Sequence, residues 1–186
     1  MSTWVWVVIA IAAVIVVAAV VWSALRTRRT RTLREGFGPE YDRTVADAPS
    51  KREAEAELDA RRKRREELDI QPLSQSSRDR YASQWKDTQA RFVDDPEEAV
   101  GEADALIQQV MRERGYPVED FDQRTADVSV DHPDVVNNYR AGHAISIANE
   151  RGNATTDDLR QAMVHYRALF VELLEEREPE TTEVSR

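Results

Sequence analysis

The sequence predicts an all-α protein with one N-terminal transmembrane helix, a charged connector helix and a C-terminal antiparallel helical bundle. An apolar run of 22 residues with a single weakly polar side chain lies near the start of the chain. Apolar side chains then recur with the 3.6-residue period of amphipathic helices over residues 72–176, and no strand pattern is convincing. The 186 residues are enough for one anchor and one soluble domain.

The apolar run extends from Trp4 to Leu25 and contains a single polar side chain, Ser23. As a helix it would span about 33 Å, which matches a hydrocarbon core of about 30 Å. Trp4 and Trp6 lie at one end and Trp22 lies at the other, as interfacial aromatic side chains do. We therefore expect a transmembrane helix over residues 4–25.

Basic residues after the apolar run set its expected orientation. A cleaved signal peptide, the alternative, would carry its basic residues before a shorter apolar core, and residues 1–3 have none. Basic residues beside a spanning helix stay in the cytoplasm, so we expect a cell-membrane protein with residues 1–3 outside and residues 26–186 cytoplasmic. These arginines are also candidates for contact with anionic lipid headgroups, although orientation alone accounts for them. The basic juxtamembrane segment, residues 26–34, contains Arg26, Arg28, Arg29, Arg31 and Arg34.

Two segments separate the arginines from the bundle. Residues 35–49 contain two glycines and two prolines, which predict a bend or linker. Residues 50–69 predict a charged connector helix that opens with capping-box spacing at Ser50 and Glu53. Acidic residues bracket its basic run at 61–65, so we interpret that run as a solvated face rather than a nucleic-acid site.

Start and stop signals divide residues 72–176 into four or five amphipathic helices with short loops. The clearest start is Asp95-Pro96, an N-cap followed by proline at the first helical position, and its matching stop is Gly115. Residues 177–186 are polar and are expected to form a flexible tail. The other signals are Tyr81, Trp85 and Phe92 on one stripe, Pro117 opening a short helix to about Val128, Asp131-His132-Pro133 opening the next helix as far as Gly152, and Thr155 or Thr156 capping the last.

Charge and composition exclude several functions. Residues 35–186 hold 21 basic and all 35 acidic residues, a net charge of −14 that disfavours nucleic acid as a partner. The chain has no cysteine, which removes thiol catalysis and cysteine-ligated metals. The sequence contains no phosphate-binding glycine loop, no H-E-x-x-H zinc motif and no Glu-x-x-His di-iron pattern. We therefore expect no catalytic residue, no metal site and no cofactor, and we do not expect an enzyme.

A polar set on the last two predicted helices is a candidate site for a ligand or partner. His143 and His165 lie on the stripes of neighbouring helices, and the arginines and tyrosines beside them offer donors to an anion. The alternative is that the histidines are separate, satisfied groups at the edge of the core. The candidate cleft comprises Tyr139, Arg140, His143, Arg160, His165, Tyr166 and Arg167.

Several stretches together carry a resemblance to a known kind of protein. They include Phe37-Gly38-Pro39-Glu40-Tyr41-Asp42-Arg43, Phe92-Val93-Asp94-Asp95-Pro96, Arg114-Gly115-Tyr116-Pro117 and Ser129-Val130-Asp131-His132-Pro133. The chain resembles, over nearly its whole length, an uncharacterised family of bacterial single-pass membrane proteins labelled only hypothetical, membrane or secreted. The resemblance implies the layout of an anchor followed by helices and implies no activity.

These observations favour a membrane-anchored helical interaction or adaptor module, with the membrane and a protein as its partners. A membrane-tethered sensory or binding domain for a small anionic ligand is the alternative. An enzyme of unrecognised type is the third possibility.

Overall fold

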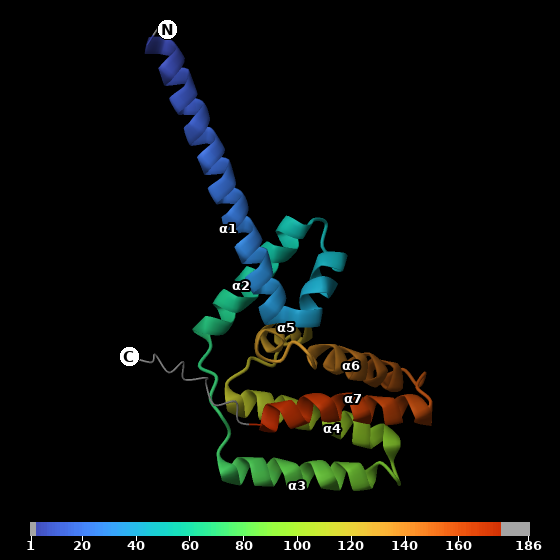
Figure 1. The fold of residues 1–186 in the computed structure, drawn as a ribbon. Helices are drawn as coiled ribbons and strands as arrows, with labels where there is room; N and C mark the ends of the chain where they lie inside the picture. Colours follow the sequence, from blue (N-terminus) through green and yellow to red (C-terminus); the bar gives the residue numbers. More distant parts are fainter. Residues whose placement is uncertain (1–2, 176–186) are drawn as a thin grey trace. The chain divides into compact units, whose positions relative to one another are not determined.

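The computed structural model describes residues 3–175, in which seven helices and no strand occur (Figure 1). The expected all-α fold is therefore confirmed. Residues 1–2 and the predicted tail over 177–186 lie outside the described residues. The chain divides into two compact units between Leu58 and Asp59, within one helix. The helices are α1 (Thr3–Asp47), α2 (Lys51–Glu67), α3 (Gln75–Arg91), α4 (Pro96–Arg114), α5 (Phe121–Asp131), α6 (Val136–Glu150) and α7 (Thr156–Leu174).

The apolar run forms the N-terminal part of α1. From Ile11 onward this helix is long enough and apolar enough to cross a membrane, with a mean hydropathy of 1.7 over its most apolar window. None of that window is buried within the protein, and Val14 is 68% exposed and Trp22 is 65% exposed. A soluble protein rarely exposes so continuous an apolar surface.

The helix α1 bends at Gly38. Its φ of 45° and ψ of −123° lie in a region that favours glycine, and Pro39 follows as the first residue of a new helical segment. The segment predicted as a linker, residues 35–49, is therefore mostly helical on both sides of one sharp break. Proline is suited to the first helical position because its fixed φ matches a helix and its missing N–H has no acceptor there.

A buried carboxylate, Glu55, connects α1 and α2 within the first unit. It accepts hydrogen bonds from the hydroxyls of Thr30 at 2.6 Å and Tyr41 at 3.0 Å, and the Lys51 ammonium lies 3.8 Å away. Burial opposes the charge on this group, but the two hydroxyls and the nearby cations outweigh it and hold the pKa of Glu55 below its usual range. Because one carboxylate oxygen bonds to both parts of α1, Glu55 helps to fix the bend.

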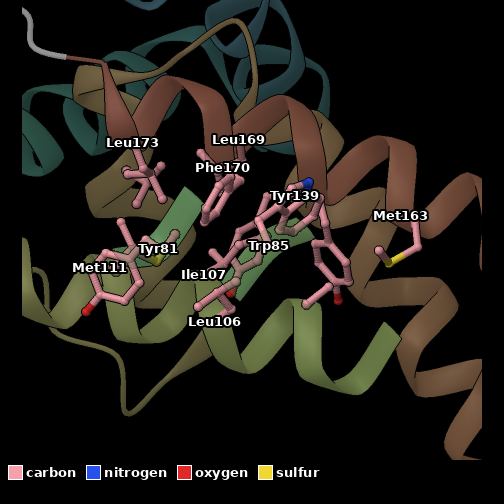
Figure 2. Close-up of a cluster of buried hydrophobic side chains, with 14 of the residues drawn as sticks. Tyr81, Trp85, Leu106, Ile107, Met111, Tyr139, Met163, Leu169, Phe170 and Leu173 are labelled. Carbon is pink, nitrogen blue, oxygen red and sulfur yellow. The ribbon is translucent and has the colours of Figure 1, made fainter. Parts of the chain in front are cut away.

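The second unit is a helical bundle in which α7 packs against both α4 and α6, and α3 packs against α4 (Figure 1). Its centre is a cluster of large apolar and aromatic side chains from these helices (Figure 2). The indole of Trp85 stacks on the ring of Phe170, with ring centroids 4.6 Å apart. This contact joins α3 to α7 across the core, and aromatic pairs of this kind contribute beyond their buried area.

The strongest start and stop signals in the sequence are confirmed. The carboxylate of Asp95 accepts the backbone N–H of Glu98 at 3.0 Å, and Gly115 ends α4 in the left-handed conformation, with a φ of 100°. A Cβ at Gly115 would lie 2.3 Å from the backbone oxygen of Asp69, so this position requires glycine. Thr155, rather than Thr156, caps α7 in a reciprocal capping box.

The predicted boundary between the third and fourth bundle helices is wrong. Asp131 is the last residue of α5, His132 caps that helix, and α6 begins only at Val136. The N–H of His132 donates to the oxygen of Val128 at 2.8 Å, which continues the α5 pattern to this point. The start of α5 also differs, because Asp120 caps it at Phe121 and not at Pro117.

The basic run at 61–65 is not simply a solvated face. Arg64 donates to the carboxylate of Asp127 at 3.0 Å, and Asp127 is fully buried. Arg65 bonds to Asp131, and Arg61 donates to the hydroxyl of Ser129 at 3.4 Å. Arg62, Lys63 and Arg64 are exposed as predicted, whereas Arg61 and Arg65 are partly buried, so the prediction of a solvated face is wrong for these two. The sequence did not indicate the contacts with α5, because the partners lie more than sixty residues away.

The helices α6 and α7 approach each other closely at Gly142. A Cβ at this position would lie 2.9 Å from Cε1 and 3.0 Å from Cδ1 of the Tyr166 ring. The ring of Tyr166 also packs against that of Tyr139, with centroids 6.1 Å apart. The absence of a side chain at 142 therefore sets how closely these two helices meet.

We expect Gly142→Ala to lower the free energy of unfolding by about 1–3 kcal/mol, because the added methyl overlaps the Tyr166 ring. Gly101→Ala is the matched control, since this helical glycine is exposed and a Cβ there meets nothing within 4 Å. Helix propensity predicts that the control raises stability by about 0.5–1 kcal/mol. Denaturant unfolding of the full chain in detergent measures both, and equal changes would contradict the close packing.

Candidate functional site

An open groove lies between the end of α3 and one flank of α7. Its volume is about 230 Å³, and we call it the α3–α7 groove. A volume of this size accommodates a side chain or a small polar group rather than a whole cofactor. The groove is lined by Gln89, Phe92, Arg160, Met163, Val164 and Arg167.

The packing of α7 places the groove. Its apolar stripe, which includes Tyr166 and Phe170, faces the core, so the neighbouring positions 160, 164 and 167 fall together on the flank of the helix. Phe92 caps α3 and packs partly against the core cluster, which supplies the second wall. The groove therefore combines two residues from the end of α3 with four residues of α7, three of which have the spacing i, i+4 and i+7.

Three of the lining side chains, Phe92, Met163 and Val164, are apolar, and we call them the apolar base of the groove, while Arg160 and Arg167 make the lining basic. Val164 is 59% exposed although it is a β-branched apolar residue, and Val93 beside Phe92 is 82% exposed. Arg160 donates to Asp157 at 2.7 Å in an exposed ion pair, which contributes little to stability. Within residues 3–175, Arg167 makes no hydrogen bond or ion pair, so its guanidinium is available to an acidic group.

The structure places the seven residues of the predicted cleft in three settings. Arg160 and Arg167 line the α3–α7 groove together. His165 contacts Asn138, with Nδ1 and Oδ1 3.1 Å apart, and Arg140 donates to Asn137 at 3.1 Å. The remaining three, Tyr139, His143 and Tyr166, turn toward the core. Binding of one anion by the whole set stays a prediction.

The three inward residues surround a carboxylate that the sequence analysis missed. Asp104 of α4 bonds to Gln108 at 2.6 Å through one oxygen, and its other oxygen is buried without a hydrogen bond. Burial first, and then the nearby Asp104 charge, raise the pKa of both Tyr139 and Tyr166 above the usual value of 10.0. Both phenols therefore stay protonated and serve as part of the core. The sequence could have indicated this buried acid, because Asp104 lies four residues after Val100 and four residues before Gln108 on the same side of α4.

His143 is half-buried, and its ring stacks on Phe121 with ring centroids 3.7 Å apart. Burial is the largest influence on this group and lowers the pKa of His143 below its ordinary value of 6.5. The neutral imidazole is thus the form that the folded protein accommodates. This is the behaviour of a core-edge histidine.

Comparisons of the chain with protein-family models, with curated proteins and with solved structures found no match. The resemblance to bacterial single-pass membrane proteins therefore stays a prediction. Within residues 3–175, no group of three or more histidine or acidic side chains is arranged to hold a metal ion.

We expect His143 to make the fold sensitive to mild acid. A histidine with a lowered pKa in the folded state stabilises the protein above about pH 6.5, and this contribution is lost as the pH falls below that value. His143→Gln should therefore reduce the loss of stability between about pH 7.5 and pH 5.5. Denaturant unfolding of both full-length proteins across this range measures the effect, and parallel pH profiles would contradict it.

Proposed function

We propose that the chain is a membrane-anchored interaction module whose α3–α7 groove binds an acidic segment of a protein partner. The observation that carries this proposal is the groove itself, where exposed apolar side chains lie beside an arginine without an ion-pair partner in the described chain. Exposed apolar surface rimmed by polar groups is typical of protein–protein contact sites. No constellation of catalytic side chains competes with this function among the described residues.

The anchor is the apolar part of α1. Its full exposure fits contact with lipid better than contact with protein, because a soluble core helix would bury such a surface. The arginines that follow it favour a cytoplasmic location for residues 26–186. The groove would then meet cytoplasmic proteins or the cytoplasmic parts of other membrane proteins.

Charge contrast supports an acidic segment as the occupant of the groove. Residues 35–186 carry a net charge of −14, so an acidic partner is repelled by most of this protein's surface. Arg160 and Arg167 are a local exception beside an apolar base. A partner segment with one large apolar side chain and a neighbouring carboxylate would fit both the apolar side chains and the arginines of the groove. Its carboxylate would disfavour binding to the acidic surface elsewhere on this protein.

The same arginine pair also favours the second candidate function, binding of a small anionic ligand. A guanidinium pairs readily with a carboxylate or phosphate whether or not a polypeptide carries it. A thermal-shift screen of phosphorylated and carboxylated metabolites separates the two. Stabilisation that depends on Arg167 and is produced by a metabolite alone would favour the ligand over the protein partner.

The orientation of the anchor is tested with single introduced cysteines, because the chain has no cysteine of its own. We expect a membrane-impermeant thiol reagent to label Ser2→Cys from the outside and Ser74→Cys only after the membrane is opened. The physical reason is the retention of Arg26 to Arg34 in the cytoplasm. The reverse pattern would refute the orientation, and loss of the chain from washed membranes would refute the anchor.

The groove is tested by photo-crosslinking from position 89, which lines it and is exposed. In the cells that make the protein, we expect a discrete adduct, and Val164→Glu should reduce its yield about tenfold, because it puts a charge on the apolar base. Val171→Glu is the matched control, since Val171 is another exposed valine of α7 that does not line the groove. An adduct that is insensitive to Val164→Glu would contradict the proposal.

A further inference from the structure

A second cavity lies in the first unit, beside the C-terminal end of the apolar run. Its volume is about 470 Å³, within the range of small-molecule sites in proteins. It lies between α1 and the first turns of α2. Its lining residues are Trp22, Leu25, Arg26, Arg29, Arg52 and Glu55.

The four residues that α1 contributes belong to one face of that helix. Trp22, Leu25, Arg26 and Arg29 have the spacing i, i+3, i+4 and i+7, and the guanidinium of Arg26 lies 5.5 Å from the centroid of the Trp22 ring. Arg52 adds a guanidinium from α2. Cationic groups from two helices therefore converge on one cavity.

The other juxtamembrane arginines are placed differently. Arg31 donates to Glu35 at 2.7 Å, and the Arg34 guanidinium lies 3.2 Å from Asp42, both in exposed ion pairs. Arg28 is exposed and does not line the cavity. Of the five juxtamembrane arginines, two line the cavity and three do not. Retention of basic residues in the cytoplasm would account for all five equally and does not explain this difference.

The charges lining the cavity favour an anion. Three arginines and one carboxylate give a formal charge of +2. The carboxylate, Glu55, already accepts hydrogen bonds from Thr30 and Tyr41 and lies near Lys51, and the charge of Arg29 also acts on it. Guanidinium groups pair with phosphate oxygens in a bidentate manner, so phosphate is the anion that this lining fits best.

The position of the cavity along α1 matches the headgroup layer. Trp22 is the interfacial tryptophan of the predicted span, and Arg29 lies four residues beyond Leu25, about 6 Å further along the helix. The polar layer on each side of a bilayer is about 5–8 Å thick. An anchored chain would therefore hold this cavity at the depth of the lipid phosphates.

We propose that this cavity binds the phosphate of an anionic phospholipid, with Arg29 and Arg52 holding the phosphate from two helices and with Trp22 and Leu25 against the apolar part of the lipid. The proposal rests on the anchoring function proposed above. It differs from general attraction of a basic segment to an anionic surface, because Arg52 lies outside the juxtamembrane segment and belongs to α2.

The test is a titration of the full-length protein in neutral detergent with phosphatidylglycerol, followed by native mass spectrometry. We expect one phosphatidylglycerol to bind in preference to phosphatidylcholine. Arg29→Gln combined with Arg52→Gln should weaken this binding at least about tenfold, because charge-assisted hydrogen bonds to the phosphate are lost. The control, Arg28→Gln combined with Lys63→Gln, removes the same charge from α1 and α2 outside the cavity and should change the affinity by less than about twofold.

Three results would overturn the proposal. They are equal losses in the two double variants, equal binding of phosphatidylcholine, and displacement of the lipid by free glycerol phosphate at comparable concentration. Circular dichroism checks that the helices persist in each variant. If the double variant loses helicity, Arg52→Gln alone carries the test, since Arg52 is exposed in the first turn of α2 and should still weaken binding.

Failure of the anchor is distinguishable from failure of the lipid site. Alkaline carbonate washing of membranes reports the anchor, and the wild-type chain and both double variants should stay in the membrane fraction. Retention of the chain without arginine-dependent lipid binding would overturn the lipid site and leave the anchor standing. Release of the chain together with arginine-dependent lipid binding would overturn the anchor and support the site.

Discussion

The arrangement of the second unit depends on the contact between Gly142 of α6 and the ring of Tyr166 in α7. The ring occupies space that any other residue at 142 would fill, and it packs there against Tyr139. This contact fixes the rotation of α7 about its own axis, because a helix cannot turn without moving its buried stripe. The same rotation brings Val164 and Arg167 to the flank beside α3. The α3–α7 groove is therefore a consequence of core packing.

The helix boundaries that the sequence predicts well are those whose signals are local. Asp95 caps α4 through a residue three positions later, and Thr155 caps α7 in the same way. Asp131 misled the prediction because it has the composition of a helix start, whereas its partners, Tyr116 and Arg65, lie 15 and 66 residues away. Contacts at that range extend α5 beyond its local stop signal, and no local pattern of residues reports them.

The candidate site was predictable only in part, for a related reason. Helical spacing shows that positions 139, 143 and 166 share stripes with apolar residues, but it does not separate a core edge from a cleft wall. Burial decides this, and it assigns the tyrosines to the core. Phe92, at the end of α3, lines the groove. Its position beside α7 depends on tertiary contacts between the two helices, such as the stacking of Trp85 on Phe170. Sequence reasoning therefore identified Arg160 and Arg167 without the apolar surface beside them.

The two arginine-lined sites face different electrostatic surroundings, and this determines what each can contribute. The α3–α7 groove belongs to a part of the chain with a net charge of −14, and salt screens exposed charges over about 10 Å. An acidic partner therefore gains little from Arg160 and Arg167 until it is in contact, so the apolar base must supply most of the affinity and the arginines the selectivity. At the end of the apolar run, Arg26 and Arg29 lie in a stretch of sequence without acids, and the proposed anchor would place them next to low-dielectric lipid. Charge would act at longer range there, so the proposed phosphate would be attracted before it reaches the cavity, and Trp22 in the lining would restrict which apolar group accompanies it.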